Sequence, residues 1–337
     1  MKLISTIVGA SLLTLLAGPA FAQAEVTLRI SAPVPTGSSV CSEQFPDWAK
    51  RIEADSGGRI KTEITCDGIL SKVGDTFDRI EAGIVDVGWD IFGRYGARFA
   101  SLNAAAVPGL FTDEQLPAAS AAFWTAYEEG LIAGEFENFK ILWFNATGNG
   151  KYFLASAPDS NIDLSGRKIA LGNPTRAALT TDLGGVPVSL SVNDYYQSLQ
   201  KGVVDGAMTS VAAIVSRAIH EVTHYYIDGP FGGGVQLVVM NKEKYDALPD
   251  DLKAVIDKNS GREQSRLIGQ MQFADEARQT AIIIEPAENQ MVALTAEEVA
   301  KIQPYFDKLL QAYAEKVEGG GDVIARLREL IAQEAGK

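Results

Sequence analysis

What this chain of 337 residues lacks excludes several classes of protein. It contains no G-x-S-x-G elbow, no P-loop and no cysteine near a histidine in a plausible triad, so few catalytic arrangements remain. Positive charge is also scarce, with 30 Lys and Arg against 43 Asp and Glu and a net charge of −13. Such a chain repels phosphate backbones and anionic lipid head groups, which argues against nucleic acid or a membrane surface as ligand. A small anion remains compatible, because its site needs only local positive charge.

Long hydrophobic runs are missing too. Beyond the N-terminus no segment approaches 18 uninterrupted apolar residues, so we do not expect a membrane-spanning helix in the mature chain. The apolar content of 46% and the charged content of 22% are typical of a folded globular protein. After removal of a leader, the chain is long enough for a large core and for two lobes.

The N-terminus is typical of a secretory signal peptide over Met1–Ala22. A basic Lys2 precedes an apolar run from Leu3 to Leu16, and the small-x-small sequence Ala20–Ala22 follows a Gly-Pro break. The alternative, a permanent N-terminal anchor, is disfavoured because a spanning helix needs about 20 apolar residues. We expect cleavage after Ala22 and export to the periplasm.

Only two cysteines are present, Cys41 and Cys66, 25 residues apart in the exported part. In an oxidising compartment a disulfide is the simplest interpretation, and closing this loop would stabilise the fold by about 3 kcal/mol. Two free thiols or a metal pair are the alternatives.

One pattern of strands and helices occurs twice in the chain. Each copy is a strand, a helix, a Gly-Gly stop, a strand, a helix and a Gly-(Ile/Val)-Val-Asp turn. The first copy has strands at 26–30, 59–64 and 83–88 with helices at 45–54 and 73–82; the second has strands at 167–171 and 186–190, helices at 172–183 and 194–200, and the turn at 202–206. Strands that alternate with helices indicate mainly parallel sheets. We therefore predict two similar α/β lobes with a cleft at the carboxyl ends of their strands. One long helix, straight or bent, is expected from Leu248 to about Thr280, with Gly261 and Gly269 as its only interruptions, and further helices at 295–315 and 323–335.

Several phrases in this order resemble the solute-binding proteins of TRAP (tripartite ATP-independent periplasmic) transporters. They are "SGGRI" at 56–60, "GIVD" at 83–86, "DLSGRKI" at 163–169, "YQSLQKGVVDG" at 196–206 and "YDALPDDL" at 245–252. The resemblance implies an α/β, two-lobed periplasmic binding protein fold with two mixed or mainly parallel sheets, a ligand cleft between the lobes and a long spanning helix. It places lobe one at 24–147 plus 236–275 and lobe two at 148–235 plus 276–337. It further implies no catalysis and no cofactor, a small-molecule ligand that is usually a carboxylate, and delivery to a permease with a small and a large membrane subunit.

The chain departs from the family pattern at Ala170, where the family places its main ligand-binding Arg. An Arg there grips a carboxylate through two parallel hydrogen bonds, and Ala cannot replace it. Thr209 stands where the family often has an Asn. Cations that compensate for Ala170 would be Arg176, at the start of a helix opened by Asn173, or Lys151, with Arg94 and Arg98 as further candidates. A solvated surface cation is the alternative for each of them.

The end of a strand in the first lobe offers Trp89 and Asp90, with Phe92 and Tyr95 nearby. Aromatic faces with one carboxylate would hold an amine; alternatively, the aromatic residues fill the core and Asp90 caps a turn. Together with Ala170, this cluster leads us to expect a small polar organic acid, sulfonate or zwitterion as ligand, and not a plain dicarboxylate. The candidate ligand contacts are therefore Trp89, Asp90, Lys151, Asn173, Arg176 and Thr209.

A competing hypothesis is an exported zinc metallopeptidase. His220-Glu221-Val222-Thr223-His224 has the H-E-x-x-H pattern, in which two histidines on one helical face bind zinc and the glutamate activates water. The β-branched residues inside the pattern and the strand-like sequence after it predict that the helix ends within it. We therefore expect no metal site here.

Overall fold

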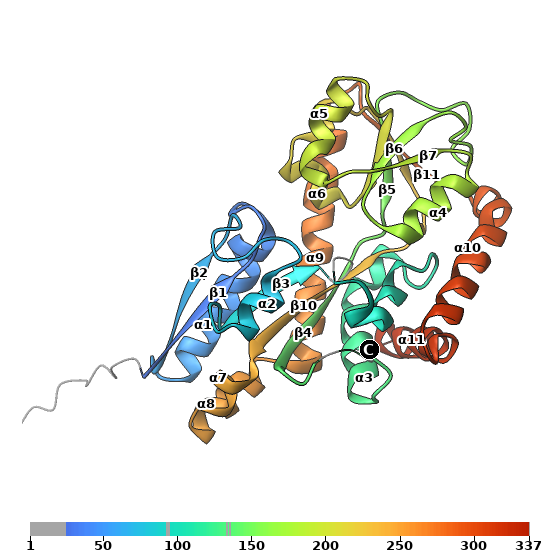
Figure 1. Cartoon of the computed structure of the whole chain (residues 1–337). Helices are drawn as coiled ribbons and strands as arrows, with labels where there is room; N and C mark the ends of the chain where they lie inside the picture. The colour runs from blue at the N-terminus through green and yellow to red at the C-terminus, as the bar shows by residue number, and fades with distance from the viewer. Residues whose placement is uncertain (1–24, 92–94, 133, 135, 337) are drawn as a thin grey trace, which may run out of the picture.

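The computed structural model describes residues 25–91, 95–132, 134 and 136–336. The predicted signal peptide lies outside the described residues. The described part forms two lobes, each built on one β-sheet, with a long helix passing between them (Figure 1). This is the two-lobed α/β architecture predicted from the repeated pattern.

The sheet of lobe one has the strand order β2-β1-β3-β10-β4. Its strands are β1 (Val26–Ser31), β2 (Ile60–Thr65), β3 (Val87–Ile91), β4 (Phe139–Thr147) and β10 (Gly234–Asn241). The three N-terminal strands are parallel, and β10 runs antiparallel to both β3 and β4. Its helices are α1 (Phe45–Asp55), α2 (Thr76–Glu81), α3 (Leu116–Glu128), α7 (Lys242–Asp246) and α8 (Asp250–Lys258).

The sheet of lobe two has the order β11-β9-β5-β8-β6-β7. Its strands are β5 (Lys151–Leu154), β6 (Lys168–Leu171), β7 (Val186–Ser189), β8 (Gly206–Thr209), β9 (Tyr225–Asp228) and β11 (Gln290–Ala293), and its helices are α4 (Pro174–Asp182), α5 (Tyr195–Gln200), α6 (Val211–Ser216) and α10 (Ala296–Lys316). Strand β5 is antiparallel to its two neighbours, and the other pairs are parallel.

The repeated unit has the same topology in both lobes, since β2-β1-β3 and β7-β6-β8 both place the first strand of the unit in the middle. Both sheets are mixed, as predicted.

Two short segments of chain cross between the sheets. Residues 148–150 lead from β4 to β5, and residues 229–233 return from β9 to β10. The two segments lie side by side, because Gly150 N–H donates to the Gly232 carbonyl at 2.9 Å. A third connection is α9 (Gly261–Ile284), which packs against α3 and β4 in lobe one and against α6 in lobe two.

The expected single helix from 248 to 280 is interrupted. Helix α8 ends at Lys258 and α9 begins at Gly261, where a φ of +88° requires the left-handed conformation that glycine adopts readily. Between the two helices, the Asn259 carbonyl accepts a hydrogen bond from Trp48 Nε1 at 2.9 Å. This buried indole fixes the carbonyl outside the helical pattern, so the break is part of the core of lobe one.

The C-terminal helix α11 (Gly320–Ala335) departs from the expected division of the chain, which assigned 276–337 to lobe two. Its buried face, which includes Val323, Leu327 and Ile331, joins the apolar cluster around α3 in lobe one. Helix α10 packs on lobe two through Ile302 and Phe306. The tail therefore spans both lobes, because an amphipathic helix buries its apolar stripe where a matching surface exists.

The predicted disulfide between Cys41 and Cys66 is present. Both half-cystines are buried in a core cluster with Trp48 and Trp143. The bridge joins the helical turn before α1, which contains Cys41, to Cys66 directly after β2. Cys41 comes at the end of the loop that follows β1. That loop borders the cleft, so the disulfide constrains one wall of it.

Candidate functional site

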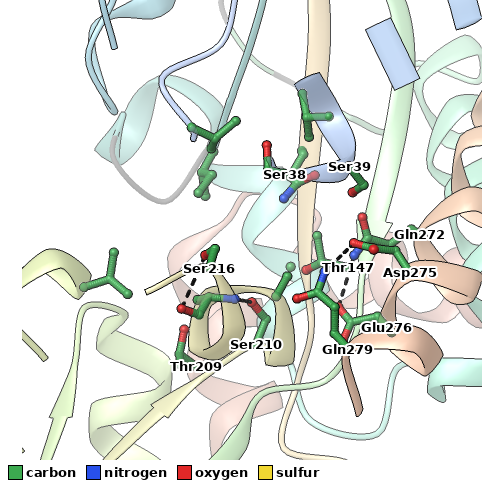
Figure 2. Close-up of a pocket in the computed structure, with 18 of the residues that line it drawn as sticks. Ser38, Ser39, Thr147, Thr209, Ser210, Ser216, Gln272, Asp275, Glu276 and Gln279 are labelled. Atoms are coloured by element: carbon green, nitrogen blue, oxygen red, sulfur yellow. Dashed lines mark hydrogen bonds between the residues drawn. The ribbon is translucent and has the colours of Figure 1, made fainter. Parts of the chain in front are cut away.

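A cavity of about 580 Å³ lies between the lobes, at the carboxyl ends of the strands as predicted. Lobe one contributes the loop after β1, the end of β3 and the start of β10; lobe two contributes the starts of α4 and α6. Helix α9 forms a further wall, and Figure 2 shows its polar residues facing serines of both lobes. Ser38 in lobe one lines the cavity with a buried hydroxyl that has no hydrogen-bond partner in the described part of the chain. The cavity is therefore shared between the lobes and contains unsatisfied polar groups.

Arg176 lines this cavity from the first turn of α4. Asn173 caps the helix, since its Oδ1 accepts the Arg176 backbone N–H at 3.1 Å. The guanidinium lies over Gly150, where a Cβ would be only 2.9 Å from Arg176 Cζ. Its Nη2 donates to the Gly232 and Gly233 carbonyls at 3.2 Å each. Asn173 also lines the cavity, so one N-cap both contributes to the lining and orients the cation.

No carboxylate of the described residues pairs with Arg176, and its buried Nε has no hydrogen-bond partner. Burial lowers the pKa of the guanidinium below its ordinary value, because a charge is costly to remove from water. A guanidinium still remains protonated at any physiological pH. The cavity thus contains a desolvated positive charge without a counter-ion.

Arg217 is a second such cation, and the sequence analysis missed it. It follows α6, which begins directly after β8, and it lines the same cavity. Its Nε donates to Asn193 Oδ1 at 2.9 Å and its Nη1 to Ser216 Oγ at 2.9 Å, and burial lowers its pKa. Among the described residues it has no acidic partner. The position of α6 at a strand end was the available signal.

Ala170, where the family pattern has Arg, is fully buried in the cluster that contains Tyr195. Tyr195 borders the cavity, but Ala170 does not line it. The positive charge of lobe two at the cavity comes from Arg176 and Arg217 instead.

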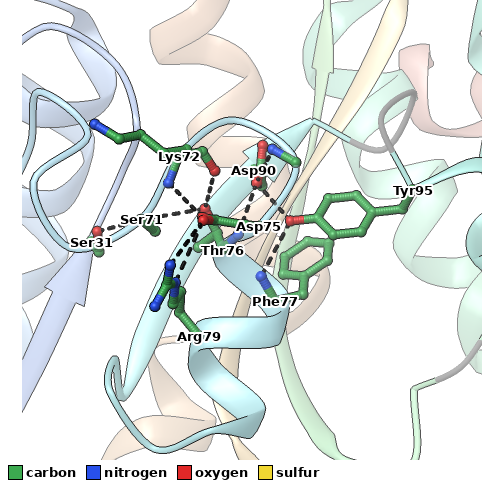
Figure 3. A network of polar contacts seen from close by, with 10 residues as sticks. Ser31, Ser71, Lys72, Asp75, Thr76, Phe77, Arg79, Asp90 and Tyr95 are labelled. Carbon is green, nitrogen blue, oxygen red and sulfur yellow. Dashed lines mark hydrogen bonds and ion pairs between the residues drawn. The ribbon is translucent and has the colours of Figure 1, made fainter.

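Trp89 and Asp90 were both predicted to face the ligand, but they lie on opposite faces of β3, because side chains alternate along a strand. Trp89 lines the cavity, and its Nε1 donates to Gln236 Oε1 at 3.1 Å. Asp90 is fully buried and is not part of the cavity lining. It accepts hydrogen bonds from the backbone of Gly74 at 2.9 Å and from the hydroxyl of Tyr95 at 2.7 Å (Figure 3). Its place matches the structural alternative, that of a capping carboxylate.

Lys151 is also absent from the cavity lining. Only 3% of the residue is exposed, and its Nζ pairs with Asp113 at 2.9 Å and with Asp228. Asp113 belongs to lobe one and Asp228 ends β9 in lobe two. The lysine therefore holds the crossover segments together, and the structure gives no support for a ligand contact.

Of the remaining residues that the sequence analysis proposed as ligand contacts, one lines the cavity and one does not. Thr209 ends β8 and lines the cavity. Arg98 pairs with Asp78 and Glu81 on α2, away from the cavity lining. Arg94 lies outside the described residues.

Helix α9 contributes polar residues that the sequence analysis did not single out, among them Gln272, Asp275 and Glu276. Arg278 bridges Asp275 and Glu43 and offsets part of their negative charge. Glu276 is 6% exposed, and burial raises the pKa of its carboxyl to about 7. Gln272 and Glu276 stand four residues apart and share one face of the helix, which was the only signal in the sequence.

The His220–His224 pattern does not form an α-helical turn. Residues Ile219–Glu221 form a short 3₁₀ turn, and β9 begins at Tyr225. His224 Nδ1 lies 2.8 Å from Asn289 Oδ1. The i, i+4 helical face that aims two imidazoles at zinc is therefore not formed, and no group of three metal-binding side chains occurs in the described ranges. The metallopeptidase hypothesis has no structural support.

None of the helices described is both long and apolar enough to cross a bilayer.

Comparison with known proteins gives a consistent result. Residues 32–316 match DctP, the bacterial extracellular solute-binding protein family 7. A curated solute-binding protein of Albidiferax ferrireducens is 25% identical over 328 residues, which cover 93% of this chain and 94% of that protein.

Solved structures agree with this match. A marine-metagenome TRAP solute-binding protein specific for aromatic acids, in complex with 3-hydroxybenzoate, superposes with a TM-score of 0.85 at 25% identity, covering 93% of this chain and 99% of that one. A TRAP solute-binding protein of Rhodoferax ferrireducens with copurified benzoate gives a TM-score of 0.83 at 26% identity, covering 92% and 98%. The match spans both lobes and the cleft between them. The chain therefore belongs to the DctP family of extracellular solute-binding proteins, whose solved relatives serve TRAP transporters.

Proposed function

We propose that this protein captures a small organic acid, sulfonate or zwitterion in the periplasm and delivers it to a TRAP-type permease. The observation that carries the proposal is the pair Arg176 and Arg217. Both line one cavity from lobe two, and neither has a carboxylate partner within the described residues. Two desolvated guanidiniums without counter-ions are costly alone, and a bound anion would offset that cost.

Ligand capture would proceed by population shift between open and closed arrangements of the lobes. Lobe two would hold the acid group through Arg176 and Arg217, while Trp89 and Ser38 would contact the ligand from lobe one. Contacts from both sides favour closure because they form together only when the lobes approach. Micromolar binding requires only about 8 kcal/mol, which a few such contacts can supply.

The ligands named for the relatives favour a carboxylate with an apolar body. They are 3-hydroxybenzoate and benzoate, each bound by a TRAP solute-binding protein of the same fold. The cavity of this chain is compatible with such a body, because apolar side chains line it together with the two cations. Those side chains include Val34, Trp89, Leu102, Met208 and Val215. We infer that Arg176 and Arg217 grip the acid group and that these residues contact the rest of the ligand.

Delivery of a ligand to a permease would explain the periplasmic location that the sequence predicts. A receptor that meets its ligand outside the inner membrane needs a leader such as Met1–Ala22, and the family resemblance implies a permease of one small and one large membrane subunit. Capture and delivery leave the ligand chemically unchanged, so we propose no enzymatic step for this chain.

Native mass spectrometry of the protein after gentle periplasmic expression tests the proposal. We expect a copurified acid in wild type, and none in the Arg176→Met/Arg217→Met double variant. A thermal-shift panel of mono- and dicarboxylates, sulfonates and zwitterions then identifies the class. Stabilisation by plain dicarboxylates alone, or by none of the four classes, would refute the proposed ligand.

A further inference from the structure

A chain of hydrogen bonds runs along the cavity wall and ends at Glu276. Trp89 Nε1 donates to Gln236 Oε1 at 3.1 Å, and Asn145 Nδ2 donates to the same oxygen at 2.9 Å. Asn145 Nδ2 also donates to Gln272 Oε1 at 3.3 Å, and Gln272 Nε2 donates to Glu276 Oε1 at 3.1 Å. Because an indole N–H can only donate, the direction of every amide in the chain is fixed. Glu276 is therefore the terminal acceptor.

The carboxyl of Glu276 is held in place and borders the cavity (Figure 2). Gln272 and Glu276 are 4% and 6% exposed. A Cβ on Gly148 would lie 3.1 Å from the Glu276 carboxyl carbon, just as a Cβ on Gly150 would lie 2.9 Å from Arg176 Cζ. The acid and the cation thus sit over the same crossover segment, at positions two residues apart. Both also line the one cavity between the lobes, where a single ligand meets both groups.

Among the described residues, three arginines and three carboxyls line the cavity. Arg278 bridges Glu43 and Asp275 and offsets part of their negative charge. Glu276 forms no ion pair with a cation of the described residues, and the nearby Lys151 Nζ is held by its own two aspartates. The groups that line the cavity without an ion-pair partner are therefore two guanidiniums and the carboxyl of Glu276.

We propose that Glu276 is a specificity-determining residue that selects a monocarboxylic acid bearing a hydroxyl group and rejects the corresponding dicarboxylate. This inference rests on the proposed function. The ligand hydroxyl donates to the free lone pairs of Glu276 while its carboxylate is held by Arg176 and Arg217. A second carboxylate at the same place would face a buried like charge, and juxtaposed like charges disfavour the wrong ligand.

Two pairs of probes with the same carbon skeleton test the inference: 4-hydroxybutanoate with succinate, and 3-(hydroxymethyl)benzoate with isophthalate. In each pair a CH₂OH group replaces a carboxylate. Calorimetric titration at pH 8 compares wild type, Glu276→Gln and Glu263→Gln. Glu263 is the matched control, since it lies on the same helix and is exposed, outside the cavity lining.

For the pair that binds, we expect wild type to favour the hydroxy acid by roughly tenfold or more. Glu276→Gln should reduce that preference by about tenfold, mainly through tighter dicarboxylate binding, and Glu263→Gln should leave it unchanged. A wild-type preference for the dicarboxylate, or an unchanged ratio in Glu276→Gln, overturns the inference. Failure of all four probes overturns it as well, and the proposed function then stands or falls separately on the wider panel. Thermal melts of each variant verify that it is folded.

Discussion

Lys151, which is buried, and Arg176, which is partly buried, are cations near the crossover segments, yet their partners differ. Lys151 lies between Asp113 of lobe one and Asp228 of lobe two. Arg176 has backbone carbonyls as acceptors but no carboxylate in the described part of the chain. In the first case the neighbouring carboxylates offset the desolvation cost and the pKa of the lysine is raised despite burial. In the second the cost remains and the pKa is lowered.

The difference distinguishes a cation that stabilises the fold from a cation that is available to bind a ligand anion. A charge whose partners are already present contributes to the free energy of unfolding, whereas a charge without partners reduces it and favours an external anion. The sequence marks both residues as candidate cations but does not reveal their partners. The following predictions test this contrast, beginning with the largest effect.

Replacing Lys151 by Met should lower the free energy of unfolding by about 3 kcal/mol, because two partly buried carboxylates lose their counter-ion. Urea denaturation measures the loss, with the exposed Lys201→Met as control. Ligand affinity, measured on the folded fraction, should change little. A tenfold loss of affinity at unchanged stability would instead make Lys151 a ligand contact.

Arg176→Met and Arg217→Met should each weaken binding of the captured acid by roughly 10- to 100-fold, since a hydrogen bond to a charged group contributes about 1.5–3 kcal/mol. The free energy of unfolding of the ligand-free protein should stay level or rise, because a desolvated, unpaired charge is removed. Calorimetric titration and urea denaturation of the same samples separate the two effects. The exposed Arg328→Met is the control, and equal affinity in all three variants contradicts the assignment.

The contribution of Glu276 to the free energy of unfolding of the ligand-free protein should increase as the pH falls from 8 to 5.5. Its folded pKa of about 7 lies above the ordinary 4.5, so the folded state takes up the proton first and gains stability below pH 7. The charged neighbours are Asp113, Lys151 and Asp275. Glu276→Gln should flatten this part of the profile by about 1–2 kcal/mol in urea denaturation. An identical profile in the variant would show that Glu276 does not titrate there.

Asp90→Asn should have the smallest effect, a loss of about 1 kcal/mol in the free energy of unfolding. The carboxylate now accepts hydrogen bonds from backbone N–H groups and a hydroxyl, and the NH₂ of the new amide could not accept them. Affinity for the acid should be unchanged, because Asp90 points away from the cavity while its neighbour Trp89 faces it. A change in affinity without a change in stability would reverse this distinction.

Periodicity and turn chemistry predicted most of the fold. The repeated pattern located both strand-helix units, and with them the strand ends where Asn173, Arg176 and Thr209 line the cavity. Gly261 marked an interruption of the long helix, but the sequence did not show that the helix breaks there or that α11 packs on lobe one, because both depend on contacts between segments far apart in the sequence. For the same reason the sequence could not show that Lys151 is paired, that Arg217 reaches the cavity, or that Glu276 ends a hydrogen-bond chain from Trp89.

A crystal structure of the protein with its copurified acid, or with the strongest stabiliser from the panel, tests the central claim most directly. The account predicts a carboxylate or sulfonate within about 3 Å of guanidinium nitrogens of both Arg176 and Arg217. An acid group that contacts neither arginine, or a ligand bound outside the cavity between the lobes, would contradict it.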